Sequence, residues 1–418
     1  MFLLGGVVTG AAAVSLALLA DEAQAAFRGL LHYSRYVSLF VTPLGFGITA
    51  YLTRRVFPNS QGSGIPQAIA ARHLIDQRAR GTLVSIRIAI GKILLTLFGL
   101  LCGASIGREG PTVQVGASIM FAAGRFSPRR QPGLILAGAS AGVAAAFNTP
   151  LAGIVFGIEE MSRAFEEKTS ALLIVAIVAA GLTSLALLGD YTYFGTTSAR
   201  LGPSGWLAVP VCGVVGGLAG GCFSRILVEF GRGLPGRVGR TIKSYPILFA
   251  TMCGLGVALC GLASHDTIYG TGYSQVKPLL DRGIAFPQSF GVLKLIATAL
   301  ASISGIPGGI FSPSLAVGAG IGFNLSMLFP STPVAALVLL GMVSYFSGVV
   351  QAPITSFVIV TEMTNDHSMV VPLMAAAFIG KAASRLICRE GVYHALSRNF
   401  IHAAEEPSQE TLKCEKIH

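Results

Sequence analysis

The sequence is short of charge and of the residue groupings that form catalytic centres. Only 12% of its 418 residues are Asp, Glu, Lys or Arg, there is one tryptophan, and the seven cysteines include no Cys-x-x-Cys pair. Scattered cysteines of this kind predict neither a disulfide framework nor a metal site, and we expect no cofactor. A membrane enzyme would need a nucleophile–base pair or a metal cluster, and neither is visible, so we do not expect an enzyme.

The sequence is instead rich in apolar residues and glycine. Hydrophobic residues make up 52% of the chain, the mean hydropathy is +0.68, and 52 residues are glycine. A soluble domain of this length does not need that balance, so we predict an all-α polytopic membrane protein. The many glycines suit closely packed and broken membrane helices.

The basic residues form short clusters between the apolar segments. The formal net charge is +11, and the excess of Lys and Arg in loops marks the cytoplasmic side of a membrane protein. We therefore expect a multi-pass membrane protein with these clusters on its cytoplasmic side. Nucleic-acid binding is disfavoured because the clusters are short and do not form one long face. The clusters are Arg72–Arg80, Arg125–Arg130, Arg232–Lys243 and Arg385–Arg398.

The chain contains an internal repeat. Gly107–Pro111 recurs as Gly309–Pro313, 202 residues later, and Pro150 recurs as Pro353 at an offset of 203. Such a constant spacing predicts two homologous halves. We place the first transmembrane repeat at residues 1–204 and the second at 205–398, each with about eight helical segments. A short cytoplasmic tail, 399–418, follows, and we expect no cytoplasmic regulatory domain.

Three glycine-bounded motifs predict helices that begin inside the membrane: Gly62–Pro66, Gly107–Pro111 and Gly309–Pro313. Proline is favoured at the first position of a helix, so we expect the second of these helices to start near its proline. A helix start presents free N–H groups and the positive end of the helix dipole, which suit an anion. Three such ends aimed at one point would bind an ion without a fixed cation, and the ion could leave again.

Two motifs place carboxylates in apolar surroundings. Arg108 and Glu109 lie between two apolar runs, where charged residues are costly and are functional candidates; a pair at the membrane edge is the alternative. Glu160 is a second candidate, with a helix-end charge as the alternative reading. It aligns with Glu362 of the second half, which we expect to be structural. Lys92 is a further cation in an apolar run, and it could either raise the local potential for anions or pair with a buried acid.

The three glycine motifs, in this order, resemble those of the CLC family of chloride channels and chloride/proton antiporters. The likeness covers about residues 3 to 400. It implies a fold of two inverted repeats with broken, re-entrant helices, and a homodimer with one pore in each subunit. It also implies chloride and protons as partners, a lipid bilayer around the protein, and the inner (plasma) membrane of a prokaryote as its location.

The resemblance also implies roles for individual residues. A central chloride would be bound by two hydroxyls and two amides, an outer site would use amides beside the gate, and a second acid would receive protons from inside. The two hydroxyls would be those of Ser63 and Tyr393, and the two amides those of Ile310 and Phe311. The outer site would use the amides of Arg108 and Gly110, beside the gate Glu109. The second acid would be Glu160. From the residues alone, Tyr393 reads as an aromatic anchor at the membrane interface.

The same resemblance favours an antiporter over a channel. Channel relatives usually carry no acid at the position of Glu160. Protonation of Glu109 would remove its charge and free the anion site, which would couple the two ions. The chain departs from some antiporters at Gln67 and Ile69, where those carry acids that line the inner proton route. Ser63, with a glycine on either side, resembles chloride-preferring members. The alternative is a passive chloride channel gated by voltage or pH.

Overall fold

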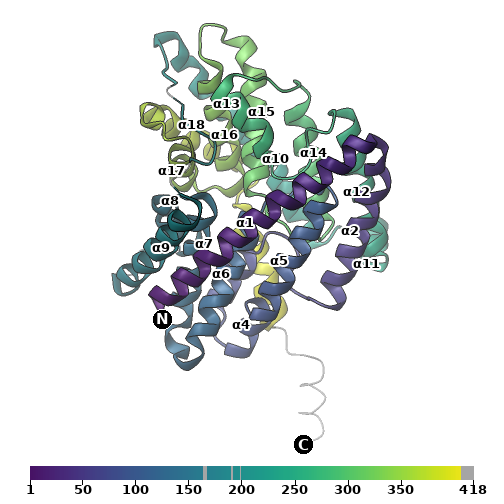
Figure 1. The fold of residues 1–418 in the computed structure, drawn as a ribbon, viewed down its shortest axis with the longest axis vertical. Helices are drawn as coiled ribbons and strands as arrows, with labels where there is room; N and C mark the ends of the chain where they lie inside the picture. The colour runs from purple at the N-terminus through teal and green to yellow at the C-terminus, as the bar shows by residue number, and fades with distance from the viewer. Residues whose placement is uncertain (163–166, 190–191, 198, 406–418) are drawn as a thin grey trace, which may run out of the picture.

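In the computed structural model of the chain, residues 1–162, 167–189, 192–197 and 199–405 are described. Within these ranges every long regular element is a helix, as predicted (Figure 1). The α-helices are α1 (Phe2–Tyr33), α2 (Ser38–Arg55), α3 (Ile65–His73), α4 (Gln77–Leu83), α5 (Ile86–Leu101), α6 (Glu109–Ala123), α7 (Gln131–Phe147), α8 (Pro150–Phe156), α9 (Glu167–Leu188), α10 (Ala208–Arg232), α11 (Gly236–Ser244), α12 (Pro246–Ala263), α13 (Tyr273–Arg282), α14 (Phe290–Ile303), α15 (Phe311–Leu325), α16 (Val334–Val350), α17 (Pro353–Thr364), α18 (Val370–Arg385) and α19 (Val392–Glu405).

The helices repeat between the two halves of the chain. Helices α6 and α15 have 15 residues each, and α7 and α16 have 17 each. Helices α7 and α16 end on the same unusual feature, a non-glycine residue in the left-handed region: Asn148 at φ 55° and Gln351 at φ 60°. The internal repeat predicted from the sequence is therefore present in the structure. Helix α19 comes after the last repeated element and runs through Glu405 without a break at residue 398.

Seven of the described helices are long and apolar enough to cross a membrane. The longest, α1, has 32 residues and packs against α9, α7 and α5, so the N-terminal segment is part of the fold. Its outward side chains include Leu3 and Leu4, which are 60% and 70% exposed. Apolar side chains on the outside of such long helices suit lipid and not water. The chain is a multi-pass membrane protein.

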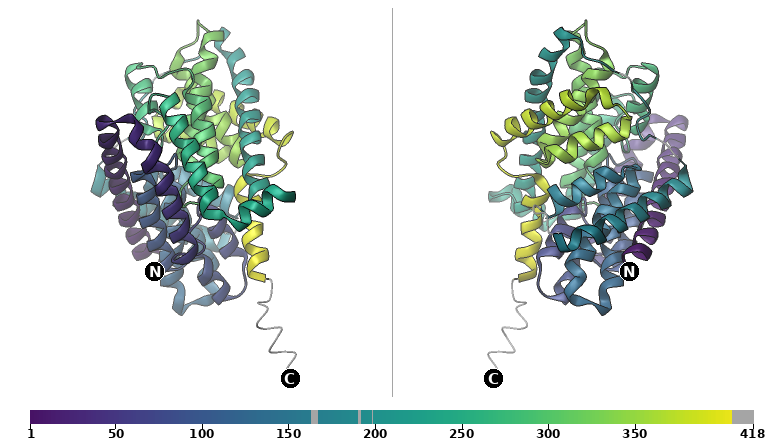
Figure 2. Two further views of the ribbon diagram at one scale, coloured as in Figure 1. Left: turned by 90° about the vertical axis from the view of Figure 1, so that its right-hand side faces the viewer. Right: turned by 90° about the vertical axis from the view of Figure 1, so that its left-hand side faces the viewer.

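The two halves pack side by side, the first drawn from purple to teal and the second from green to yellow (Figures 1 and 2). Helix α19 returns to the first half and packs against α3 as well as α10. Helix α4, which overlaps the basic segment Arg72–Arg80, lies at one end of the molecule together with the end of α19, and α13 lies toward the other end (Figure 1). The basic end is the cytoplasmic one by the positive-inside rule.

Close approach between helices depends on glycine at repeat-related positions. A Cβ atom on Gly116 of α6 would lie 2.2 Å from the carbonyl oxygen of Gly138 in α7. In the second half, a Cβ atom on Gly318 of α15 would lie 2.5 Å from the carbonyl oxygen of Gly341 in α16. Small residues at such contacts let membrane helices approach until their backbones touch. This packing fixes the starts of α6 and α15 in space.

One predicted helix boundary is wrong by two residues. Helix α6 begins at Glu109 and not near Pro111. The first four N–H groups of a helix have no partner inside it, so proline fits anywhere in the first turn and does not have to occupy the first position. Glu109 is therefore the first residue of α6, and its side chain is located at the N-terminus of that helix.

Candidate anion site and gate

Backbone hydrogen bonds join the three helix breaks into one structure. Gly107 and Gly309 exchange two bonds, with N···O distances of 2.6 and 2.8 Å. Gly62 donates to the carbonyl of Ile306 at 3.1 Å and accepts from the amide of Gly308 at 3.0 Å. The N-termini of α3, α6 and α15 therefore converge, as the sequence predicted from its three glycine motifs.

Side chains and amides at this point lack protein partners. The amide hydrogens of Ile310 and Phe311 find no acceptor among the described residues, although both residues are buried. The hydroxyls of Ser63 and Tyr393 are also buried, and neither has a hydrogen-bond partner among the residues that the structure describes. Gly110 lies directly beside Ser63, since a Cβ atom on it would be 2.3 Å from the Ser63 oxygen. Buried donors without partners indicate a binding site for an acceptor.

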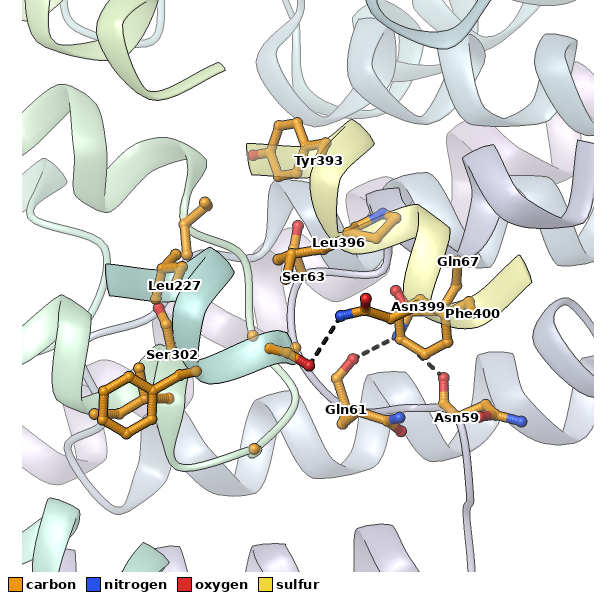
Figure 3. A pocket seen from close by; sticks show the side chains of 18 of the residues that line it. Asn59, Gln61, Ser63, Gln67, Leu227, Ser302, Tyr393, Leu396, Asn399 and Phe400 are labelled. Atoms are coloured by element: carbon orange, nitrogen blue, oxygen red, sulfur yellow. Dashed lines mark hydrogen bonds between the residues drawn. The ribbon is translucent and has the colours of Figure 1, made fainter. Parts of the chain in front are cut away.

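Ser63, Ile310 and Tyr393 line a cavity of about 430 Å³ (Figure 3). Figure 3 shows Ser63 and Tyr393 close to each other in its upper part, with Gln61 and Asn59 below them. The cavity reaches the last turns of α19, where Asn399, Phe400 and Ala403 lie. Because that end of α19 lies at the basic end of the molecule, the cavity extends from the candidate site toward the basic end.

Two buried lysines hold repeat-related loops. Lys92 Nζ donates to the three carbonyls of Ser60–Gly62, at 2.6–3.4 Å. Its counterpart Lys294 donates to two carbonyls of the loop before α13, both at 2.7 Å. Of the two roles that the sequence left open for Lys92, pairing with an acid is not observed among the described residues. Its contacts instead fix the loop that carries Ser63.

Glu109 is fully buried at the start of α6. Its Oε1 atom accepts a hydrogen bond from Tyr193 Oη at 3.3 Å, and its Oε2 atom has no partner among the described residues. The guanidinium of Arg108 contacts the carboxylate of Asp21 in α1 at 2.7 Å and the carbonyl of Ala17. The Arg108 side chain is thereby neutralised, which leaves its backbone for an anion. Burial of both residues argues against a pair at the membrane edge.

Glu160 is 3% exposed and lies in a π-helical segment, Gly157–Ser162. The ring of His394 contacts it twice, at 2.7 Å from the backbone carbonyl and 3.7 Å from the carboxylate. Tyr393 is fully buried, so it is not an interfacial anchor.

Glu159, the acid next to Glu160 in the sequence, contacts the start of a helix and not His394. Glu159 accepts hydrogen bonds from the first amides of α17, at 2.6 and 3.2 Å. Glu362 accepts from the first amides of α8, at 2.7 and 3.1 Å. Each carboxylate caps a helix start in the other half, where it also opposes the helix dipole. By its contacts, the counterpart of Glu362 is Glu159, one residue away from the alignment made by sequence.

Sequence reasoning missed Tyr193, the hydrogen-bond donor to Glu109. It lies near the predicted end of the first repeat at residue 204, and no role was predicted for it. The signal was the presence of Tyr193 and Phe194 side by side in an otherwise polar stretch. Both are 1% exposed, so the segment enters the core.

A family model described as voltage gated chloride channel matches residues 44–385, which is most of the chain. The chain belongs to the voltage-gated chloride channel (CLC) family. An H(+)/Cl(−) exchange transporter ClcA of Yersinia pestis is 29% identical, over 96% of this chain and 87% of the relative. The protein of the same name from Citrobacter koseri is 28% identical, over 88% of this chain and 81% of the relative.

Solved CLC structures share the fold. A slow cyanobacterial Cl⁻/H⁺ antiporter superposes with a TM-score of 0.81 at 23% identity, covering 96% of this chain and 97% of its own. A CLC-type fluoride/proton antiporter gives 0.80 at 23% identity, covering 94% and 96%. These likenesses confirm the predicted all-helical CLC architecture.

Proposed function

We propose that the protein exchanges chloride for protons across the membrane. Relatives that align with nearly the whole chain are named for this exchange. The observation that carries the proposal is the position of Glu109, a buried carboxylate at the point where three helix N-termini meet. A titratable acid at an anion site gives one side chain through which both ions act.

Chloride binds to partial charges and not to a fixed cation. Its ligands are the free amides of Ile310 and Phe311 together with the hydroxyls of Ser63 and Tyr393; the amides around Arg108 and Gly110 serve an outer position. The buried cations Arg108 and Lys92 are engaged with other partners, namely Asp21 and the carbonyls of the loop that carries Ser63. Weak, multiple ligands allow an ion to enter and also to leave.

Protons reach the site through Glu160. Glu109 competes with chloride for the same donors while it is charged, and it stops competing once it is protonated. Glu160 lies against His394, and the residue before His394 in the sequence, Tyr393, lines the cavity together with Ser63. Protons from the cytoplasm therefore pass to Glu160 and then to Glu109, while chloride passes along the Ser63–Tyr393 cavity.

The protein works in the inner (plasma) membrane as a homodimer, with one such pathway in each subunit. We place its first repeat at residues 1–204, its second at 205–398 and a short tail at 399–418; this last segment begins within α19, which continues to Glu405, and 406–418 lie outside the described part. Apolar side chains on the outer faces of α1 and α9 provide surface for lipid or for a second subunit, for example Leu18 and Leu182, at 52% and 59% exposed.

The second candidate function is passive chloride conduction, since Glu109 could gate a channel by the same protonation. Measurement of the reversal potential in planar bilayers, under combined chloride and pH gradients, separates the two. An exchanger gives a reversal potential that shifts with the pH gradient. A value that stays at the chloride equilibrium potential at every pH gradient would establish a channel.

A further inference from the structure

The Glu109 carboxylate has its hydrogen-bond donor outside the helix breaks. In the described part of the chain Tyr193 Oη donates to its Oε1 atom, and its Oε2 atom has no hydrogen-bond partner. The amides of Ile310 and Phe311 meanwhile have no acceptor there. The Glu109 carboxylate is therefore bonded to Tyr193 and not to these amides, and the Tyr193 hydroxyl also lies 3.5 Å from Ser312 Oγ in the first turn of α15.

Both halves of the protein hold the ring of Tyr193. It packs edge-on against Phe147 at the end of α7, with 5.4 Å between ring centroids. It packs in the same way against Tyr273 at the start of α13, at 4.9 Å. Edge-to-face aromatic pairs add specific geometry to apolar burial. The position of the Tyr193 hydroxyl is thus set by contacts from both halves.

The segment around Tyr193 is also fixed through its backbone. The amide of Phe194 donates to the carbonyl of Met363 at 2.9 Å, beyond the middle of α17. Thr197 donates through its hydroxyl to the carboxylate of Asp366 at 2.6 Å. A flexible connection between two repeats needs no such contacts. The segment is placed so that one hydroxyl reaches the gate.

We propose that Tyr193 is the outer dock of the gate, a hydroxyl that binds the Glu109 carboxylate after it has left the amides at the start of α15. The dock faces α13 and so lies away from the basic, cytoplasmic end. This inference rests on the proposed function, in which Glu109 and chloride compete for the same amides. A donor that binds the carboxylate elsewhere lowers its share of those amides and strengthens chloride binding.

Titration calorimetry of chloride into the full-length protein in detergent tests the dock. Tyr193→Phe removes the hydroxyl and keeps the ring, so packing against Phe147 is retained. We expect chloride affinity to fall by roughly threefold to tenfold, the effect of losing one hydrogen bond. Tyr273→Phe is the matched control, because it removes a neighbouring hydroxyl that bonds Lys277 and not the gate; chloride affinity should not change.

The decisive comparison repeats Tyr193→Phe in a Glu109→Ala background. With no carboxylate to dock, the substitution should leave chloride affinity unchanged. An equal loss of affinity in both backgrounds, or no loss in either, would overturn the dock while chloride binding itself stands. Absence of chloride binding in the unmodified protein would instead remove the proposed function, and the dock with it. Apparent melting temperatures show that each variant is folded.

Discussion

Glu159 and Glu362 each cap the short helix that begins in the opposite half. The Glu159 carboxylate receives the first amides of α17, and Glu362 receives those of α8. The two caps therefore join the halves reciprocally, one at the start of α17 and the other at the start of α8. Glu160 is adjacent in sequence to one cap and yet is buried against His394. Two neighbouring acids thus have separate tasks.

Removal of a cap should lower stability and spare ion coupling. Glu159→Gln and Glu362→Gln each lose a charged acceptor for two helix amides, at a cost of about 0.5–2 kcal/mol. We expect lower apparent melting temperatures in detergent for both variants, with an unchanged ratio of chloride to proton flux in liposomes. Loss of proton flux in Glu159→Gln at unchanged stability would show that Glu159 carries protons, which contradicts its assignment as a helix cap.

Glu160→Gln should stop proton movement and leave chloride movement. The amide keeps the shape of the buried side chain but cannot take up and release a proton at physiological pH. Chloride efflux from liposomes should stay within about threefold of the unmodified protein, while proton uptake disappears. This range is about 0.6 kcal/mol, the scale of an ordinary surface substitution. Equal proton fluxes in variant and unmodified protein would refute the assignment.

Lys92→Met should weaken chloride binding by displacing Ser63. The substitution leaves the carbonyls of Ser60–Gly62 without their buried donor, and each lost bond of this kind costs about 1–3 kcal/mol. We expect at least a threefold loss of chloride affinity by calorimetry. Lys294→Met is the matched control, since it releases the repeat-related loop before α13, away from Ser63. A larger loss of affinity in the control would contradict the argument.

Gly110→Ala should reduce chloride transport through a steric clash. Its new methyl group would lie 2.3 Å from the Ser63 oxygen and 2.7 Å from the Ser63 carbonyl oxygen. Ser63 must move, so we expect chloride flux to fall by about tenfold, equivalent to about 1.4 kcal/mol. Gly29→Ala in α1 serves as the control, because no atom lies within 4 Å of the added carbon. Full flux in Gly110→Ala would show that Ser63 is not held as described.

The convergence of helix starts was predictable because local chemistry encodes it. Glycine and proline mark a break in a helix wherever they occur, and the offset of 202 residues between Gly107 and Gly309 shows that the breaks are related. The start of α6 was misplaced by two residues because proline is compatible with several positions of a first turn. Local rules thus predict the presence of a break better than its boundary.

Contacts between distant segments were not predictable in the same way. The sequence around Tyr193 does not indicate Glu109 as its partner. The contact depends on how the connection between the halves packs on α7 and α13. The reciprocal caps were also missed, because alignment paired Glu362 with Glu160 and only the hydrogen bonds select Glu159. Lys92 was recognised as unusual, but its acceptors are backbone carbonyls, which leave no trace in the residue pattern.

The central claim is that Glu109 couples the two ions. Its most direct test is simultaneous recording of chloride efflux and external pH from liposomes containing Glu109→Gln. The glutamine cannot be protonated or carry charge, so we predict continued chloride efflux with no accompanying proton movement. Proton transport coupled to chloride in this variant, at the ratio of the unmodified protein, would contradict the account.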